Sequence, residues 1–159
     1  LETSLRWARR TKGVFDPTVA PLLDLWDIPS GPHPPPSPES LRAAREKLTS
    51  DFWPKNAKEA VAVTAHEHPL NRTYRQVSTY WEMVYRMARH GIIHGDFLVE
   101  NNGEGLLLYA KVEPYLAEIR AATSPRSFQN AEGVAKEVPM GRTIAEHMRA
   151  RVKKTLAAK

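Results

Sequence analysis

Histidines are the first side chains in this sequence that could bind a metal ion. His66 and His68 flank a glutamate, and His90 lies four residues before His94. Metal sites on helices usually place two histidines four residues apart on one face, or a glutamate three residues before a histidine. Gly91 interrupts the helix between the second pair, residues two apart diverge on a helix, and no Glu-x-x-His occurs. We therefore predict no metal site, and we expect these histidines at polar helix ends.

Acidic residues are the other candidates, because two neighbouring carboxylates can act as general acid and base. The sequence does not show which glutamates approach one another; the candidates are Glu82, Glu100, Glu104, Glu113 and Glu118. The chain has no cysteine, which excludes disulfides, thiolate metal sites and cysteine nucleophiles. It also lacks a Gly-x-Ser-x-Gly elbow, a Walker loop and a Gly-x-Gly-x-x-Gly turn. We predict no catalytic residue.

The composition is that of a globular protein. Apolar residues make up 42% and charged residues 26% of the 159 residues, which suits one domain or two very small ones. No apolar run reaches about 18 residues and no signal segment opens the chain, so we expect a cytoplasmic protein. The first residue is Leu1, inside an expected helix, so we also expect the N-terminal part to be incomplete.

The positive charge lies at the C-terminal end. Six Lys or Arg side chains face a single glutamate between residues 142 and 159, so this segment alone accounts for the net charge of +5. A basic helix of this kind could contact nucleic acid or an acidic partner. The alternative is a solvated helix end, where cations suit the helix dipole; no aromatic or groove-reading motif accompanies the charges.

The N-terminal third is predicted to form helices separated by a proline-rich loop. A first helix ends at Gly13, which suits the position just after a helix. Asp16 then caps a short apolar helix over residues 17–26. Residues 29–36 contain five prolines and therefore form an extended loop. Another helix follows over residues 37–48.

The composition changes near residues 49–51. We place a boundary there, between a helix-loop-helix part, residues 1–50, and a helical domain, residues 51–159. Helices are predicted in the second part over residues 54–66, 72–90, 105–122, 125–138 and 142–158. The β-branched alternation that strands need is nearly absent. We therefore predict an all-α protein, a small irregular helical bundle with an N-terminal helical arm and a proline-rich loop.

The helix over residues 72–90 has the clearest pattern. We expect Asn71 to cap it, Gly91 to end it and Asp96 to cap a short helix after it. Its apolar residues are spaced by three or four: Tyr74, Val77, Trp81, Val84, Tyr85 and Ala88. In the next long helix, Pro114 predicts a kink or a restart.

One run near the N-terminus carries a specific resemblance. Residues 11–22 read Thr-Lys-Gly-Val-Phe-Asp-Pro-Thr-Val-Ala-Pro-Leu. Leu25-Trp26, a proline-rich loop and a Ser-Pro-Glu helix start follow in that order. With this arrangement, residues 1–48 resemble one segment of the FAD:protein FMN transferases, the ApbE family.

The resemblance implies a transferase that attaches FMN to a protein hydroxyl and uses FAD and magnesium. It places four residues in the cofactor site: Gly13, Val14, Phe15 and Asp16. Their alternative roles are structural, as a helix-ending glycine, core residues and an N-cap carboxylate. A cap carboxylate repels a phosphate, so this segment would line at most one side of a flavin site.

The chain departs from the family pattern in ways that matter for activity. Lys12 and Ala20 stand where the family usually has glycine, and Asp27-Ile28 stands where it has Gly-Phe. The family's Asp-x-Gly-Gly-x-x-Lys-Gly region and its Asp/Thr magnesium motif do not occur. FMN transfer needs a metal ion on the pyrophosphate and an oriented acceptor. We therefore predict no catalytic activity for this chain on its own.

Residues 51–159 are similar to a family of uncharacterised bacterial helical proteins. The similarity lies in four runs: residues 51–55, 80–84, 103–105 and 113–120. It implies no chemistry.

Two functions follow from these observations. The first is a truncated FAD:protein FMN transferase-like protein without activity on its own. The second is a non-enzymatic helical interaction or structural module. We expect an unknown protein partner or self-association, and a nucleic-acid contact through the basic C-terminal helix is a third hypothesis.

Overall fold

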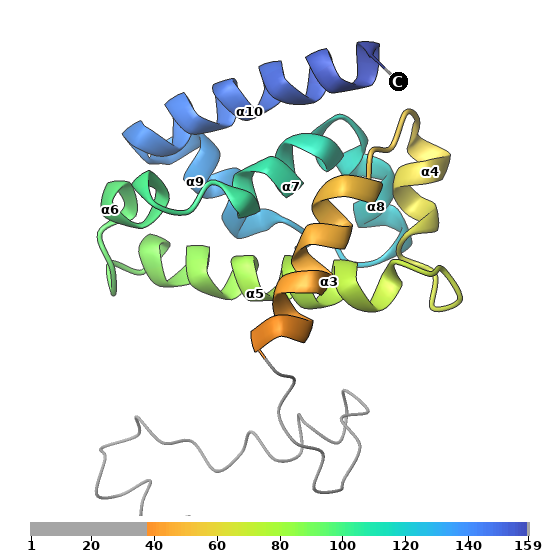
Figure 1. Cartoon of the computed structure of the whole chain (residues 1–159). Coiled ribbons are helices and arrows are strands. Elements are labelled where there is room, and N and C mark those ends of the chain that lie inside the picture. Colours follow the sequence, from red (N-terminus) through yellow and green to blue (C-terminus); the bar gives the residue numbers. More distant parts are fainter. Residues whose placement is uncertain (1–37, 159) are drawn as a thin grey trace, which may run out of the picture. The chain divides into compact units, whose positions relative to one another are not determined.

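The structure is a computed structural model that describes residues 38–158, which form helices with no strand among them (Figure 1). The elements are α3 (Pro38–Asp51), α4 (Ala57–Ala62), α5 (Asn71–Arg89), α6 (Gly95–Glu100), α7 (Glu104–Val112), a 3-10 turn η1 (Glu113–Tyr115), α8 (Leu116–Ala122), α9 (Gln129–Glu137) and α10 (Pro139–Ala157). The all-α prediction is confirmed. The predicted N-terminal helical arm and proline-rich loop lie outside the described residues.

Helix α5 is amphipathic, as its spacing predicts. Its buried side chains are Tyr74, Val77, Trp81 and Tyr85, with Val84 and Ala88 half-buried beside them. Gly91 follows the helix with φ of +69°, a left-handed conformation that favours glycine, so α5 ends at Arg89.

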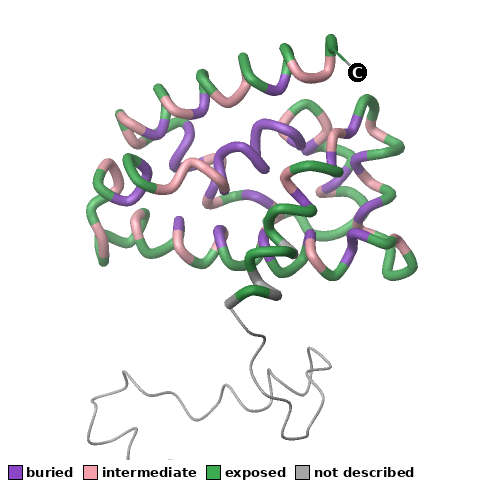
Figure 2. Tube along the Cα trace, in the orientation of Figure 1, coloured by how far each residue is buried: buried purple, intermediate pink, exposed green. Residues whose placement is uncertain are grey.

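Helix α7 runs through the centre of the fold and is buried on all sides (Figure 2). It packs against α5 on one side and α10 on the other. A helix surrounded by protein must be apolar around its whole circumference. The run Leu106 to Leu108 meets this need, and Lys111 is the one charged residue among the buried positions of α7.

The contact between α5 and α7 depends on Gly105. A Cβ atom at this position would lie 2.6 Å from Cγ of Trp81 and would also overlap the hydroxyl of Tyr85. Only a residue without a side chain lets the backbone of α7 approach the aromatic side chains of α5 this closely. Gly105 therefore sets the spacing between these two helices.

Pro114 breaks the long helix predicted over residues 105–122. Helix α7 ends at Val112, η1 contains the proline, and α8 restarts at Leu116. The predicted restart is confirmed, because proline has no N–H to continue the α-helical hydrogen bonds.

Several helix starts differ from the prediction, among them α9, which begins at Gln129 rather than at residue 125, and α10, which begins at Pro139 rather than at residue 142. Helix α4 begins at Ala57 rather than at Pro54, because Oδ1 of Asn56 accepts a hydrogen bond from the Glu59 N–H at 2.9 Å and caps the helix there. Asn71 is not the cap of α5. It is buried in the first turn, and its Nδ2 donates to the Val63 carbonyl at 2.9 Å, which joins α5 to the end of α4.

The C-terminal end of α3 packs on the helices that follow it. Leu48 and Phe52 belong to the main core. Nζ of Lys111 donates to the Thr49 carbonyl at 2.8 Å and lies 3.8 Å from the centre of the Trp53 ring. The described residues 38–158 belong to one compact unit. The division into residues 1–50 and 51–159 stays a prediction.

Candidate functional site

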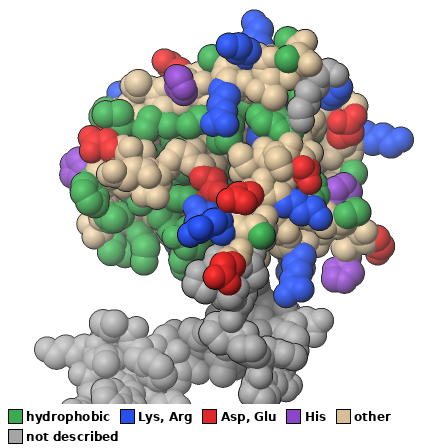
Figure 3. Space-filling model, in the orientation of Figure 1, with side chains coloured by type: hydrophobic (Ala, Val, Ile, Leu, Met, Phe, Trp, Pro, Cys, Tyr) green, Lys and Arg blue, Asp and Glu red, His purple; other side chains and the backbone are tan. Residues whose placement is uncertain are grey.

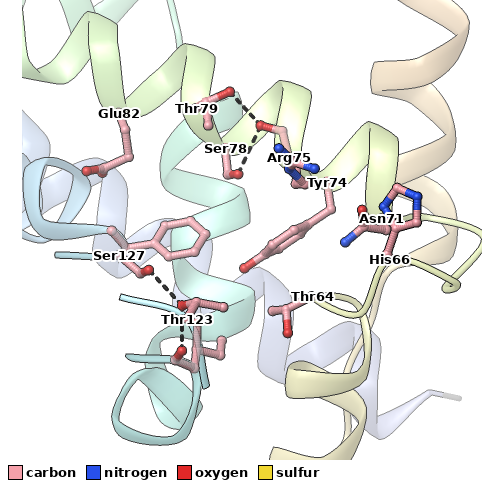
Figure 4. A pocket seen from close by; sticks show the side chains of 12 residues that line it. Thr64, His66, Asn71, Tyr74, Arg75, Ser78, Thr79, Glu82, Thr123 and Ser127 are labelled. Atoms are coloured by element: carbon pink, nitrogen blue, oxygen red, sulfur yellow. Dashed lines mark hydrogen bonds between the residues drawn. The ribbon is translucent and has the colours of Figure 1, made fainter. Parts of the chain in front are cut away.

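A cavity of about 350 Å³ lies between α5 and the segments around residues 64–66 and 119–128 (Figure 4). We call it the α5 pocket. Its lining comes from residues 64–66 after α4, from α5 between Asn71 and Glu82, from Ile119 of α8, and from residues 123–128. This volume lies at the lower end of the range of small-molecule sites, about 300–1,000 Å³.

Tyr74 points into the α5 pocket (Figure 4). The residue is only 5% exposed, and its ring packs edge-on against Phe52 and tilted against Phe128, with centroid distances of 5.5 and 6.2 Å. Its hydroxyl makes no hydrogen bond to the other described residues. Burial raises the pKa of the Tyr74 phenol, so the group stays protonated and can donate.

Phe128 forms the opposite wall in an unusual backbone conformation. Its φ is +57°, the only positive φ of a non-glycine residue within the described part of the chain. Left-handed conformations of bulky residues are strained and tend to occur at functional sites or tight connections. Here the conformation turns the chain directly into α9 while the ring stays buried beside Tyr74.

Hydroxyl groups surround the rest of the α5 pocket. Thr64 donates to the Val61 carbonyl at 2.7 Å, and Thr123 contacts the Ile119 carbonyl at 2.6 Å and the Ser127 hydroxyl at 2.9 Å. On α5, Ser78 and Thr79 both bond back to the Arg75 carbonyl. Most of these protons are therefore engaged with the protein, and the free lone pairs make the wall polar.

The charged side chains lie at different ends of the α5 pocket. Arg75 and His66 lie near Tyr74, whereas Glu82 lies two helical turns further along α5 (Figure 4). Arg45, Arg89, Arg120 and Arg149 each pair with a carboxylate, whereas Arg75, which is exposed, makes no ion pair with the acids of residues 38–158. The Arg75 end therefore has uncompensated positive charge.

The carboxylate of Glu82 accepts hydrogen bonds from the N-terminus of α9. Its Oε1 accepts from the Ala131 N–H at 2.8 Å, and its Oε2 accepts from the N–H and the Nδ2 of Asn130 at 3.0 and 3.1 Å. The first N–H groups of a helix have no partner within that helix, and its N-terminal dipole favours negative charge. Glu82 thus caps α9 from another helix.

The remaining half-buried acids of the described residues also have structural partners. Oδ1 of Asp96 accepts from the Met140 N–H at 2.8 Å and so caps α10, not its own short helix, whose cap is His94. Glu104 binds Arg45 at 2.6 Å and the Trp81 indole at 2.8 Å. The other two acids are Glu113, held by Arg149 and Tyr109, and Glu132, held by Arg120 and Lys136.

This corrects the expectation that Asp96 caps the short helix after α5. It also answers the question left open for the five glutamates. Glu82, Glu104 and Glu113 each bind different donors and do not pair with one another, while Glu100 and Glu118 are exposed. The carboxylates of Glu82, Glu104 and Glu113 are thus engaged as hydrogen-bond and ion-pair acceptors.

A second feature is an exposed apolar surface over α6 and the neighbouring end of α5 (Figure 3). We call it the α5–α6 face, and it consists of Tyr80, Met83, Met87, Ile92 and Phe97, which are between 42% and 72% exposed. Three of them recur at helical spacing along one side of α5. The exposed charged residues of α5 are all arginines: Arg72, Arg75, Arg86 and Arg89.

The basic C-terminal helix is α10. Arg149 is bound to Glu113 by two hydrogen bonds of 2.6 and 2.9 Å, so it is neutralised. Four further cations are exposed: Arg142, Arg151, Lys153 and Lys154. The nucleic-acid contact stays a prediction.

The residues that the resemblance placed in a cofactor site, Gly13, Val14, Phe15 and Asp16, lie outside the described residues. No group of three or more His, Asp or Glu side chains within residues 38–158 could hold a metal ion. The absence of a metal site from the whole chain stays a prediction. None of the described helices is long and apolar enough to span a membrane.

Sequence reasoning missed the α5 pocket. A signal was present, because Arg75, Ser78 and Glu82 follow the helical period beside the core stripe of α5. A polar stripe of this kind is usually solvated, so only its position next to residues 123–128 makes it part of a cavity.

Comparison with known proteins gives two family matches. Residues 37–138 match the model of the domain of unknown function DUF4760, and residues 1–69 match the model of the ApbE family. The two matches overlap over α3 and α4. No curated protein and no solved structure matches the chain.

Proposed function

The chain belongs to the DUF4760 family, and we propose that its helical domain is a non-enzymatic interaction module. Its partner would be an amphipathic segment with acidic flanks that docks on the α5–α6 face. The ApbE-like segment before it would have no transferase activity on its own.

The observation that carries this proposal is the combination of apolar and positive side chains on α5. Met83 and Met87 lie exposed on the helix, with Arg86 beside them. Methionine is flexible and polarisable, so exposed methionines suit surfaces that bind amphipathic helices. Exposed apolar patches of a folded domain commonly mark interaction sites.

The charges favour an acidic partner over a second copy of the chain. Glu82 is the only acid of α5, and it is turned to the N-terminus of α9. Two copies meeting through the α5 part of this face would bring Arg86 against the Arg86 of the other copy, and the exposed acid of α6 is Glu100. An acidic flank on a different partner would complement them and accelerate association.

The arrangement of the acids supports a non-enzymatic role. A catalytic carboxylate must reach a proton on the substrate and must change its protonation state. The half-buried acids of the described residues instead hold helix N-termini, arginines, a lysine, a tyrosine and an indole.

The proposal is tested with a fluorescent synthetic helical peptide that has leucines on one face and glutamates on its flanks. We expect saturable anisotropy with the purified full chain. Met83→Asp should weaken binding at least about tenfold, or about 1.4 kcal/mol. Ala150→Asp is the matched control, because it adds the same charge at an exposed position of α10 and should leave binding unchanged.

A peptide of the same length with lysines in place of the glutamates distinguishes specific docking from nonspecific hydrophobic binding. Equal binding of both peptides, or equal loss in both variants, would contradict the proposal. Concentration-dependent dimerisation that Met83→Asp abolishes would instead identify a second copy as the occupant and overturn the acidic-partner assignment.

The ApbE match at residues 1–69 favours a second candidate function. The N-terminal segment would retain part of a flavin site, with FAD and magnesium as ligands and without catalytic turnover. Titration of FAD with Mg²⁺ into the full chain, followed by flavin fluorescence, tests this candidate. Saturation at micromolar FAD that Phe15→Ala and Asp16→Ala abolish would support it, and no binding near millimolar FAD would retire it.

A further inference from the structure

We propose that the α5 pocket binds a small organic anion with an apolar body, whose carboxylate or phosphate group lies at the Arg75 end. This site is separate from the proposed docking face, and it rests on three observations: an unused hydroxyl donor on a buried tyrosine, an asymmetric charge distribution and aromatic walls.

The unused donor is the hydroxyl of Tyr74. It is directed into the cavity from a residue that is 5% exposed, without a hydrogen bond to any other described residue (Figure 4). Among the described residues, the fully buried side-chain oxygen without a partner is that of Tyr85, so the Tyr74 oxygen is in contact with the cavity and free to donate there. The anionic oxygen of a ligand would accept its proton.

The charges orient the ligand. Arg75 is one residue beyond Tyr74 and lines the same cavity, as does His66. At the other end, Glu82 is already held by three donors at the start of α9. An anion is therefore attracted to the Arg75 end and repelled from the Glu82 end, which gives the site a direction.

The walls match an apolar body. Tyr74, Phe128 and Ile119 are buried and line the cavity. The left-handed conformation of Phe128 holds its ring beside Tyr74. Ligand sites are mostly apolar with a few convergent polar groups, which is the composition of this cavity.

The test uses phenyl phosphate and benzoate as anionic probes and benzyl alcohol as the neutral probe. Each is titrated into the full isotope-labelled chain, and amide NMR shifts of residues 74–82 and 123–128 are followed. We expect saturable shifts with at least one anion and at least about tenfold weaker binding of benzyl alcohol. The stronger of the two anions distinguishes a phosphate site from a carboxylate site.

Two variants and one control identify the contacts. Tyr74→Phe keeps the ring and removes the hydroxyl, and Arg75→Gln removes the charge; each should weaken the anion at least about fivefold. Arg72→Gln removes an exposed arginine of the same helix that does not line the cavity, so binding should change less than about twofold.

Two results would overturn the proposal. One is the absence of saturable shifts in the folded chain with either anion. The other is a loss in Arg72→Gln as large as that in Arg75→Gln, which would indicate general attraction to a basic helix. Far-UV circular dichroism shows that each variant is folded before its titration is interpreted.

Discussion

The carboxylate of Glu82, in the middle of α5, accepts the backbone N–H of Ala131 at 2.8 Å, 49 residues further along the chain. With the two bonds from Asn130, it supplies the cap that α9 lacks locally, since Phe128 at the N-cap position has no side-chain acceptor. This contact joins the start of α9 to α5 and closes one end of the α5 pocket.

Glu82→Ala should therefore lower the free energy of unfolding by about 2 kcal/mol, because lost caps cost about 0.5–2 kcal/mol and N–H groups are left without a partner. Urea denaturation followed by circular dichroism measures the change. Glu118→Ala, at an exposed glutamate, is the control and should stay within about 0.5 kcal/mol. Equal losses in the two variants would mean that the cap contributes nothing.

Gly105→Ala should destabilise the chain by about 1–3 kcal/mol, although alanine favours helix more than glycine does. The added Cβ would meet the ring of Trp81, which is buried and has no room to move. Gly103→Ala is the control, since its Cβ would meet the flexible Cε of Met148. Thermal denaturation compares them, and a stabilised Gly105→Ala would refute the close approach of α5 and α7.

Lys111→Met should loosen α3 more than the rest of the domain. The ammonium group binds the Thr49 carbonyl at the end of α3 and lies over Trp53. A methionine side chain keeps an apolar stem of similar length but makes neither the hydrogen bond to the Thr49 carbonyl nor the cation–π contact with Trp53. Hydrogen exchange of the amides between residues 45 and 51 should accelerate at least about tenfold, whereas Lys153→Met on α10 should leave them unchanged. Uniform acceleration across all helices would contradict a local role.

Glu132 should make stability depend on acid pH. Hydrogen bonds from Lys136 and then Arg120 lower the pKa of its carboxyl below the usual value for glutamate. A lowered folded-state pKa means that the stabilisation is present above the unfolded pKa and is lost as the pH falls through the folded pKa. The stability difference between the chain and its Glu132→Gln variant should therefore shrink between about pH 5 and pH 3.

Urea denaturation at several pH values measures that difference. Glu118→Gln serves as the comparison, because it replaces an exposed glutamate on α8. A difference for Glu132→Gln that stays constant down to about pH 3 would show that the ion pairs with Arg120 and Lys136 do not contribute to folding.

The sequence by itself determined the features that depend on neighbouring residues. The stripe from Tyr74 to Tyr85, the end of α5 at Gly91 and the restart at Pro114 all follow from helical spacing or from the backbone preferences of one residue type. Short local runs of residues also carried the two family resemblances. The ApbE match at residues 1–69 agrees with the first, and the DUF4760 match at residues 37–138 agrees with the second.

Only the tertiary structure decided which acidic side chain caps the N-terminus of which helix. Asp96 has the residue type and position of a local cap, yet it caps α10, and Glu82 caps α9. An orphan N–H group accepts any carboxylate that the packing brings within reach, so its partner depends on how helices meet and not on sequence distance. The α5 pocket has the same origin, because Tyr74 and Phe128 become its walls only when residues 123–128 lie against α5.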